Sequence, residues 1–162
     1  MPFVLNNQLN HQPKSQPLVL IVENHEDTRL MLKQILGIWG CRSIEVEYGE
    51  GAVGVAERAR PDLILMNVGF PHFDGIEATR HIRQTPALKE VPIIILSSYA
   101  EPTFCQTALA AGGNDYLIKP IELLQLETLV VKHLDRFANR NNIVVGKFSS
   151  ADSVLPPDSR EV

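Results

Sequence analysis

The chain has 162 residues, of which 44% are hydrophobic, and its formal net charge is −4. This length suits one domain with its own hydrophobic core, and the slightly acidic balance argues against nucleic acid as a partner. Because no apolar run reaches the roughly 18 residues of a membrane span and residues 1–17 lack the apolar core of a secretory signal, we expect a cytoplasmic protein that binds no membrane.

Both ends of the chain are expected to be flexible. Residues 1–17 are rich in Asn, Gln and Pro without periodicity, and residues 140–162 are again mostly polar. Apolar runs and helical patterns are confined to residues 18–139, which we expect to form the domain. No helix-turn-helix and no catalytic motif follows this region, so we expect no separate output module. Cys41 and Cys105 are expected to be reduced thiols.

Four short, continuous apolar runs predict strands that are buried on both faces of a parallel sheet. These runs are residues 18–22, 63–66, 93–96 and 116–118. A fifth strand is expected at residues 44–48, where Ile44, Val46 and Tyr48 alternate with two glutamates. Such alternation is typical of an edge strand with one face in water.

Helical patterns separate these strands. The first helix has an apolar stripe of Met31, Leu32, Ile35, Leu36, Ile38 and Trp39, and Gly40 is placed to end it. The second helix begins near Ala52 and ends before Pro61, and the third begins at Asp74, where Asp74 and Glu77 resemble a capping box. The fourth has Pro102 in its first turn and ends at Gly112. The fifth is lined by Leu123, Leu126, Val130, Leu134 and Phe137.

Five β units that alternate with five α units predict an α/β fold, a doubly wound five-stranded parallel sheet with helices on both faces. In such sheets, functional sites form beyond the carboxyl ends of the strands. The residues that follow the buried strands are therefore candidate site residues. They are Glu23, Asn24, Asn67, Ser97, Ser98, Lys119 and Pro120.

These strand-end residues resemble the response regulator receiver family over residues 18–137. Five fragments carry the resemblance, in the expected order: residues 22–24, 61–67, 71–75, 96–97 and 114–120. The resemblance implies a flavodoxin-like fold with strand order 2-1-3-4-5. It also implies a role in two-component or phosphorelay signal transduction.

In a typical receiver, an acidic pair after the first strand and an aspartate after the third strand hold Mg²⁺, and that aspartate accepts the phosphoryl group. Here Asn67 stands at the phosphoacceptor position, and Asn24 replaces one member of the acidic pair while Glu23 keeps the other. Ser97, Tyr116 and Lys119 match the switch and phosphate-contact positions of the family.

These departures change the chemistry that the resemblance implies. An amide oxygen is a poor nucleophile, so Asn67 cannot form an acyl phosphate. Mg²⁺ prefers anionic oxygen ligands, and the charge of the matched positions rises from about −2 to about zero, so we expect Mg²⁺ binding to be lost or weak. Lys119 then needs another anion, and we expect it to pair with Glu23.

The resemblance and its departures together predict a stand-alone atypical receiver, a pseudo-receiver that is not an enzyme and acts as a signalling adaptor. Its expected partners are a sensor histidine kinase, another receiver, a phosphorelay protein or a second copy of the chain in a homodimer. The contact surface is expected on the fourth helix, fifth strand and fifth helix, as is common in the family.

Three alternatives stay open. The first is a conventional phosphoaccepting single-domain response regulator, in which another acid replaces Asn67. The second is an enzyme or cofactor binder on a flavodoxin-like scaffold, which the acidic, glycine-free loop 23–27 disfavours because phosphate groups prefer bare backbone N–H groups. The third is a transition-metal site made of Glu23, His25 and His72.

Overall fold

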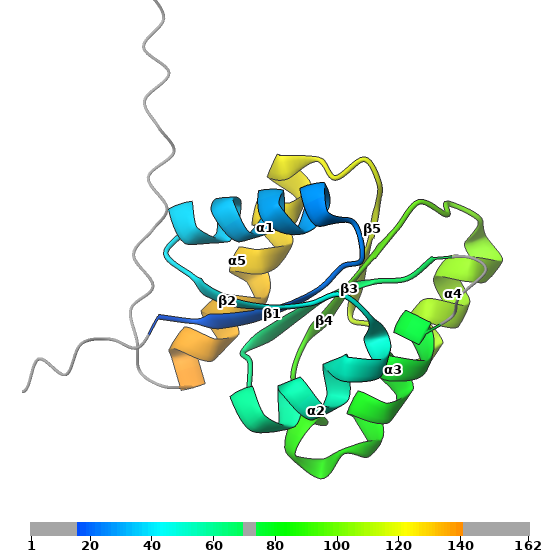
Figure 1. Cartoon of the computed structure of the whole chain (residues 1–162), viewed down its shortest axis with the longest axis horizontal. Coiled ribbons are helices and arrows are strands. Elements are labelled where there is room, and N and C mark those ends of the chain that lie inside the picture. Colours follow the sequence, from blue (N-terminus) through cyan, green and yellow to red (C-terminus); the bar gives the residue numbers. More distant parts are fainter. Residues whose placement is uncertain (1–15, 70–73, 141–162) are drawn as a thin grey trace, which may run out of the picture.

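The computed structural model describes residues 16–69 and 74–140, and for Asp74 and residues 135–140 it describes the backbone alone. Within these residues, strands and α-helices alternate along the chain (Figure 1). The strands are β1 (Leu18–Val22), β2 (Arg42–Val46), β3 (Leu63–Asn67), β4 (Ile93–Ser97) and β5 (Asp115–Ile118). The helices are α1 (Glu26–Ile38), α2 (Gly49–Ala59), α3 (Asp74–Gln84), α4 (Pro102–Ala110) and α5 (Leu123–Arg140), with a short 3₁₀ helix η1 (Pro86–Leu88) before β4.

The five strands form one parallel sheet in the order β2-β1-β3-β4-β5. Val22 of β1 lies beside Val46 of β2 and Met66 of β3, and Ile95 of β4 lies beside Tyr116 of β5. Figure 1 shows α1 and α5 on one face of this sheet and α2 and α3 on the other. The expected flavodoxin-like α/β fold, with the receiver strand order, is therefore confirmed.

The strands form where the sequence is apolar on both faces. All residues of β1 and all of β4 are buried. The predicted strands 63–66, 93–96 and 116–118 are each one residue longer in the structure, by Asn67, Ser97 and Asp115 respectively. These added residues are polar, so an apolar run alone could not indicate them.

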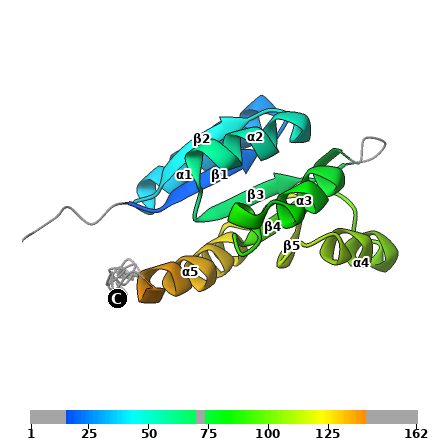
Figure 2. The same cartoon turned by 90° about the horizontal axis from the view of Figure 1, so that it is seen from below.

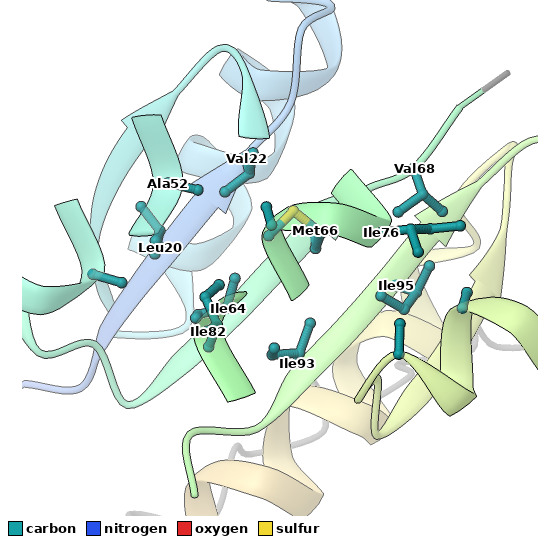
Figure 3. Close-up of a cluster of buried hydrophobic side chains, with 14 of the residues drawn as sticks. Leu20, Val22, Ala52, Ile64, Met66, Val68, Ile76, Ile82, Ile93 and Ile95 are labelled. Atoms are coloured by element: carbon teal, nitrogen blue, oxygen red, sulfur yellow. The ribbon is translucent and has the colours of Figure 1, made fainter. Parts of the chain in front are cut away.

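Alternate side chains of the strands point to two separate hydrophobic core clusters, one on each face of the sheet. Figure 3 shows the first cluster, which contains Leu20, Ile64 and Ile93 of the strands together with Ile76 and Ile82 of α3. The second cluster lies under α1 and α5. It contains Ile21, Leu65, Ile94, Leu32, Leu36, Leu126 and Val130.

β2 lies at the edge of the sheet, as the alternating pattern predicted. Ile44 and Val46 are partly buried and pack against the first cluster. Tyr48 was predicted to lie in this strand, but it is the N-cap of α2 and is 60% exposed. The strand stops at Val46 because its register partner in β1, Val22, is also the last residue of β1.

For two residues of the predicted apolar helix stripes, the expected burial is wrong. Ile38 is 82% exposed because it lies about 200° around α1 from buried Leu36. Leu123 is 50% exposed because it begins α5 at the end of the sheet, before the helix reaches the core. The predicted helix ends fit better: Gly40 has a positive φ of 81° after α1, and Pro102 occupies the first turn of α4.

Several expectations lie outside the described residues. They concern the leader up to residue 15, the tail beyond residue 140, His72, and the side chains of Asp74 and Phe137. The expected domain limits at residues 18 and 139 therefore stay predictions. In the described part of the chain, no helix is both long and apolar enough to cross a membrane.

Candidate functional site

Polar side chains gather at the carboxyl edge of the sheet, where the parallel strands end together. Glu23 and Asn24 follow β1, Asn67 ends β3, Ser97 ends β4, and Lys119 follows β5. We call these five residues the strand-end cluster. Backbone hydrogen bonds align them: the Glu23 N–H donates to the Val46 carbonyl at 3.0 Å, and the Lys119 N–H donates to the Ser97 carbonyl at 2.7 Å.

Glu23 is fully buried and both of its carboxylate oxygens have partners. Oε2 accepts a hydrogen bond from the Lys119 ammonium at 2.7 Å, which confirms the expected direct ion pair. Oε1 accepts the His25 backbone N–H at 3.0 Å and lies 3.2 Å from Nδ1 of the same histidine. Lys119 is itself only 16% exposed, so the pair is largely removed from water.

Asn24 and Asn67 contact each other directly. The Asn67 amide nitrogen donates to the Asn24 amide oxygen at 2.9 Å, and this bond joins the ends of β1 and β3. Two carboxylates at this separation would repel each other, whereas two amides offer one donor and one acceptor. The sequence placed both residues at this edge but gave no reason to expect the bond.

Ser97 and Tyr116 both bond to the backbone of Tyr99, two residues beyond β4. The buried Ser97 hydroxyl oxygen accepts the Tyr99 N–H at 3.1 Å, and the Tyr116 hydroxyl donates to the Tyr99 carbonyl at 2.6 Å. The Tyr99 ring also lies 5.1 Å from the Phe104 ring of α4. Burial raises the pKa of the Tyr116 hydroxyl to about 12, so it remains a donor at neutral pH.

Sequence reasoning missed Tyr99. It lies two positions after the end of β4, but its hydrogen bonds to Ser97 and Tyr116 use its backbone N–H and carbonyl. Residue identity gives no information about such backbone contacts. Of the predicted site residues, Glu23 contacts Lys119 and Asn24 contacts Asn67, while Ser97 and Tyr116 share Tyr99. The polar groups of these residues are therefore bonded to one another or to nearby backbone.

The structure describes two of the three residues of the alternative transition-metal site. Glu23 and His25 are in contact, and the His25 side chain is 70% exposed, but His72 is not among the described residues. Among the residues that are described, no group of three or more His, Cys, Asp or Glu side chains is placed to hold a metal ion.

Comparison with known proteins now identifies the family. A family model, the response regulator receiver domain, matches residues 19–131. The chain belongs to the response regulator receiver domain family. Members of this family take part in two-component signalling and interact with histidine kinases and phosphorelay proteins.

Individual relatives agree with this assignment. The chain is 34% identical, over 75% of its own length and 93% of the relative's, to an uncharacterized 14.6 kDa protein in the sodA1 3′ region of Leptolyngbya boryana. It is 39% identical, over 67% of its length, to the KDP operon transcriptional regulatory protein KdpE of Escherichia coli, of which it spans 47%. It spans only 20% of the protein RcaC of Microchaete diplosiphon.

Solved structures show the same fold. The receiver domain of the sensor histidine kinase PA1611 from Pseudomonas aeruginosa aligns with a TM-score of 0.68 and 35% identity, covering 75% of this chain and 99% of that domain. That structure has a magnesium ion coordinated in its active site cleft. The chemotaxis protein CheY4 of Vibrio cholerae aligns with a TM-score of 0.65 and 30% identity, covering 75% of this chain and 98% of CheY4.

Proposed function

We propose that this chain is an atypical receiver that works in two-component or phosphorelay signalling by binding a partner protein, without accepting a phosphoryl group. The observation that carries the proposal is the hydrogen bond between Asn67 and Asn24. An amide stands at the end of β3, the position that matches the family's phosphoacceptor aspartate. Its neighbour is a second amide, so the nucleophile and one metal-binding acid are both replaced.

The chemistry of Asn67 supports this proposal. A carboxylate attacks phosphorus with a charged oxygen and forms an acyl phosphate. In an amide, the nitrogen lone pair is delocalised onto the oxygen and neither atom is a comparable nucleophile. The Asn67 nitrogen is also engaged as a donor to Asn24. No residue of the strand-end cluster other than Glu23 has a carboxylate, and Glu23 is buried against Lys119.

The same contacts do not fit a magnesium site. Mg²⁺ usually takes one or two carboxylates and several waters in octahedral geometry. Here the one carboxylate of the cluster uses one oxygen for the Lys119 ammonium and the other for the His25 N–H. A cation would have to displace Lys119 and overcome its positive charge. The PA1611 receiver domain, which holds magnesium in its cleft, therefore differs from this chain in the proposed metal chemistry.

The proposed partner surface consists of α4, β5 and α5. None of the nine residues of α4 is charged. Four large apolar side chains of these elements are exposed: Leu109 (41%), Ile118 (45%), Leu123 (50%) and Leu124 (69%). Exposed apolar side chains on neighbouring elements are typical of protein interaction surfaces. The proposed partners are a sensor histidine kinase, another receiver, a phosphorelay protein or a second copy of this chain.

A conventional phosphoaccepting single-domain response regulator is the second candidate. The observation in its favour is that Glu23, Ser97 and Lys119 keep the residue types that the family uses around its phosphoryl group. This candidate requires a different acceptor, because Asn67 has no carboxylate. The two candidates therefore differ in a covalent phosphoryl adduct, which changes the mass of the protein.

Intact-mass measurement after incubation with acetyl phosphate and Mg²⁺ distinguishes them. We expect no mass change in the natural sequence. The matched control is the double variant Asn24→Asp with Asn67→Asp, which restores the acids and is expected to gain one phosphoryl group. A phosphoryl adduct on the natural sequence that maps to the strand-end cluster would overturn the proposal.

A further inference from the structure

Helix α3 connects the strand-end cluster to the turn between α4 and β5. Its first turn lies against the end of β3, and its last turn contacts the residues that lead into β5. Figure 2 shows α3 lying across β3 and β4, with α4 beyond it. Between these contacts the helix is fixed to the sheet by Ile76 and Ile82, which are 1% and 0% exposed.

The first contact depends on the absence of a side chain at Gly75. A Cβ added to Gly75 would collide with the Asn67 carbonyl oxygen and would lie 2.7 Å from Cγ1 of Val68. The helix backbone thus touches the backbone of Asn67 itself. The Thr79 hydroxyl donates to the Gly75 carbonyl at 2.7 Å and holds this first turn. A shift of the Asn67 carbonyl toward α3 would therefore press on the backbone of the helix.

The second contact is made by the Arg83 side chain, which binds two separate segments. On the β5 side, Nε donates to the Gly112 carbonyl at 2.9 Å, and one terminal nitrogen donates to the Asn114 side-chain oxygen at 2.8 Å. On the β4 side, the other terminal nitrogen donates to the Val91 carbonyl at 2.7 Å. The planar guanidinium distributes five N–H donors over three nitrogens and reaches both segments at once, whereas the three donors of an ammonium all lie on one atom.

Gly112 and Asn114 fit this contact closely. Gly112 has a φ of +125°, and a Cβ there would lie 3.0 Å from Nε and 3.1 Å from Cδ of Arg83. The Asn114 side-chain oxygen also accepts the Ile93 N–H at 2.8 Å, so Arg83 and the start of β4 share one acceptor. Arg83 therefore contacts the segment that connects the end of α4 to the start of β5.

We infer that α3 couples the strand-end cluster to the α4–β5–α5 surface, with Arg83 as the positioning residue at the far end. Gly75 and Arg83 are separated by about 12 Å of helix at 1.5 Å per residue; the first contacts the Asn67 backbone directly, and the second reaches the Gly112 carbonyl through its side chain. This route does not pass through Ser97 or Tyr116. The inference rests on the proposed function in one respect, since it takes α4, β5 and α5 as the partner surface. Partner binding there would then change the Asn24–Asn67 contact, and the reverse effect is equal by linkage.

Nuclear magnetic resonance of the isolated chain tests this coupling. Arg83→Lys keeps the charge but replaces three donor nitrogens by one, so we expect it to shift the side-chain amide resonances of Asn67 and Asn24. The matched control is Arg80→Lys, because the exposed Arg80 side chain contacts Glu77 of the same helix. A purely structural role for Arg83 would lower the melting temperature and leave those two amide resonances unchanged.

The reverse direction uses Gly75→Ala, which pushes α3 away from Asn67. We expect it to shift the backbone resonances of Gly112 and Asn114, whereas Gly37→Ala should not, since an added Cβ at Gly37 meets nothing within 4 Å. If Gly75→Ala does not fold, Arg83→Lys alone decides. Unchanged Asn24 and Asn67 amide resonances in Arg83→Lys would overturn the inference. These spectra are recorded without a partner or a phosphodonor, so a negative result would not bear on the proposed function.

Discussion

The two edges of the sheet use polar side chains in different ways. At the carboxyl edge, four residues of the strand-end cluster pair side chain to side chain: Glu23 with Lys119, and Asn67 with Asn24. At the amino edge, Asp62 and Arg83 bond mainly to backbone groups. Asp62 accepts the Leu18 N–H at 2.8 Å, and Arg83 donates to the Gly112 and Val91 carbonyls.

This difference determines what each edge tolerates. When both partners are side chains, both can be replaced together and no buried group is left unpaired. When one partner is a backbone carbonyl, no second substitution can remove it. The carboxyl edge can therefore change its chemistry by paired substitutions, as Asn24 and Asn67 illustrate. At the amino edge, Asp62 and Arg83 are each expected to be required individually.

The largest effect is expected from breaking the buried ion pair on one side only. Lys119→Met should lower the free energy of unfolding by about 3 kcal/mol, because it leaves the buried Glu23 carboxylate without its cation. The double variant Glu23→Gln with Lys119→Met should recover more than half of that loss. Urea denaturation measures both. A double variant as unstable as the single one would mean that this edge does not tolerate paired replacement.

The next effect concerns the amino edge. Arg83→Ala should lower the free energy of unfolding by about 2–3 kcal/mol, because it leaves the Val91 and Gly112 carbonyls without their charged donor. Arg80→Ala, one turn earlier on α3, should cost less than about 0.5 kcal/mol, since the Arg80–Glu77 pair is exposed. Equal losses for the two arginines, measured in the same denaturant, would mean that the backbone acceptors of Arg83 add nothing to its contribution to stability.

A smaller effect tests the charge of the strand-end cluster. Restoring both acids, Asn24→Asp with Asn67→Asp, should lower stability in a chelator by about 1–3 kcal/mol, after water and partial protonation reduce the mutual repulsion of three carboxylates. With a dissociation constant of about 1 mM, about 10 mM Mg²⁺ should return about 1.4 kcal/mol.

The natural sequence is the control for this experiment and should respond little to Mg²⁺. Thermal melts of both proteins, in chelator and in Mg²⁺ at matched ionic strength, give the comparison. If Mg²⁺ stabilises the natural sequence as much as the double variant, the strand-end cluster holds metal despite its two amides, and the proposed loss of metal chemistry is wrong.

The smallest effect is a pH dependence at the amino edge. Burial raises the pKa of the Asp62 carboxyl above its ordinary value of 3.8, although the Leu18 N–H and Arg42 oppose the shift. A raised pKa means that the folded state holds the proton more tightly than the unfolded state. This contribution to stability is therefore greatest below pH 3.8 and is lost as pH rises through the folded-state pKa.

Asp62→Asn keeps an acceptor for the Leu18 N–H but does not titrate. The stability of the natural sequence, measured relative to Asp62→Asn by urea denaturation, should therefore fall as pH rises above about 4. A relative stability that increases over that range would show that the hydrogen bond and Arg42, rather than burial, dominate at this carboxyl.

Sequence reasoning was sufficient for the fold because it depends on strongly apolar runs. The run Leu18–Val22 matched β1 residue for residue. Ile38 and Leu123 were wrong because an apolar residue does not itself indicate whether the core reaches its side of the helix. The Glu23–Lys119 pair could be expected, since opposite charges at one buried edge require each other.

Other contacts could not be expected from the sequence. The Asn24–Asn67 bond joins two neutral groups, each of which could have bonded to backbone or water instead. In the sequence, Arg83 is an ordinary polar residue near the end of a helix. Its acceptors, the Gly112 and Val91 carbonyls, come together only in the folded protein. Tyr99 acts through its N–H and carbonyl, which every residue but proline has.

The position of β1 between β2 and β3 also bears on how the protein is made. A ribosome releases β1 and β2 early, but β1 keeps an unpaired apolar edge until β3 has emerged. At about 5–20 residues per second, that interval is on the order of seconds. During synthesis, the nascent chain therefore exposes a segment of five apolar residues with which other unfinished chains can pair. Slower translation between α1 and β3 would lengthen this exposure. A chaperone that binds residues 18–22 would prevent their pairing with other chains.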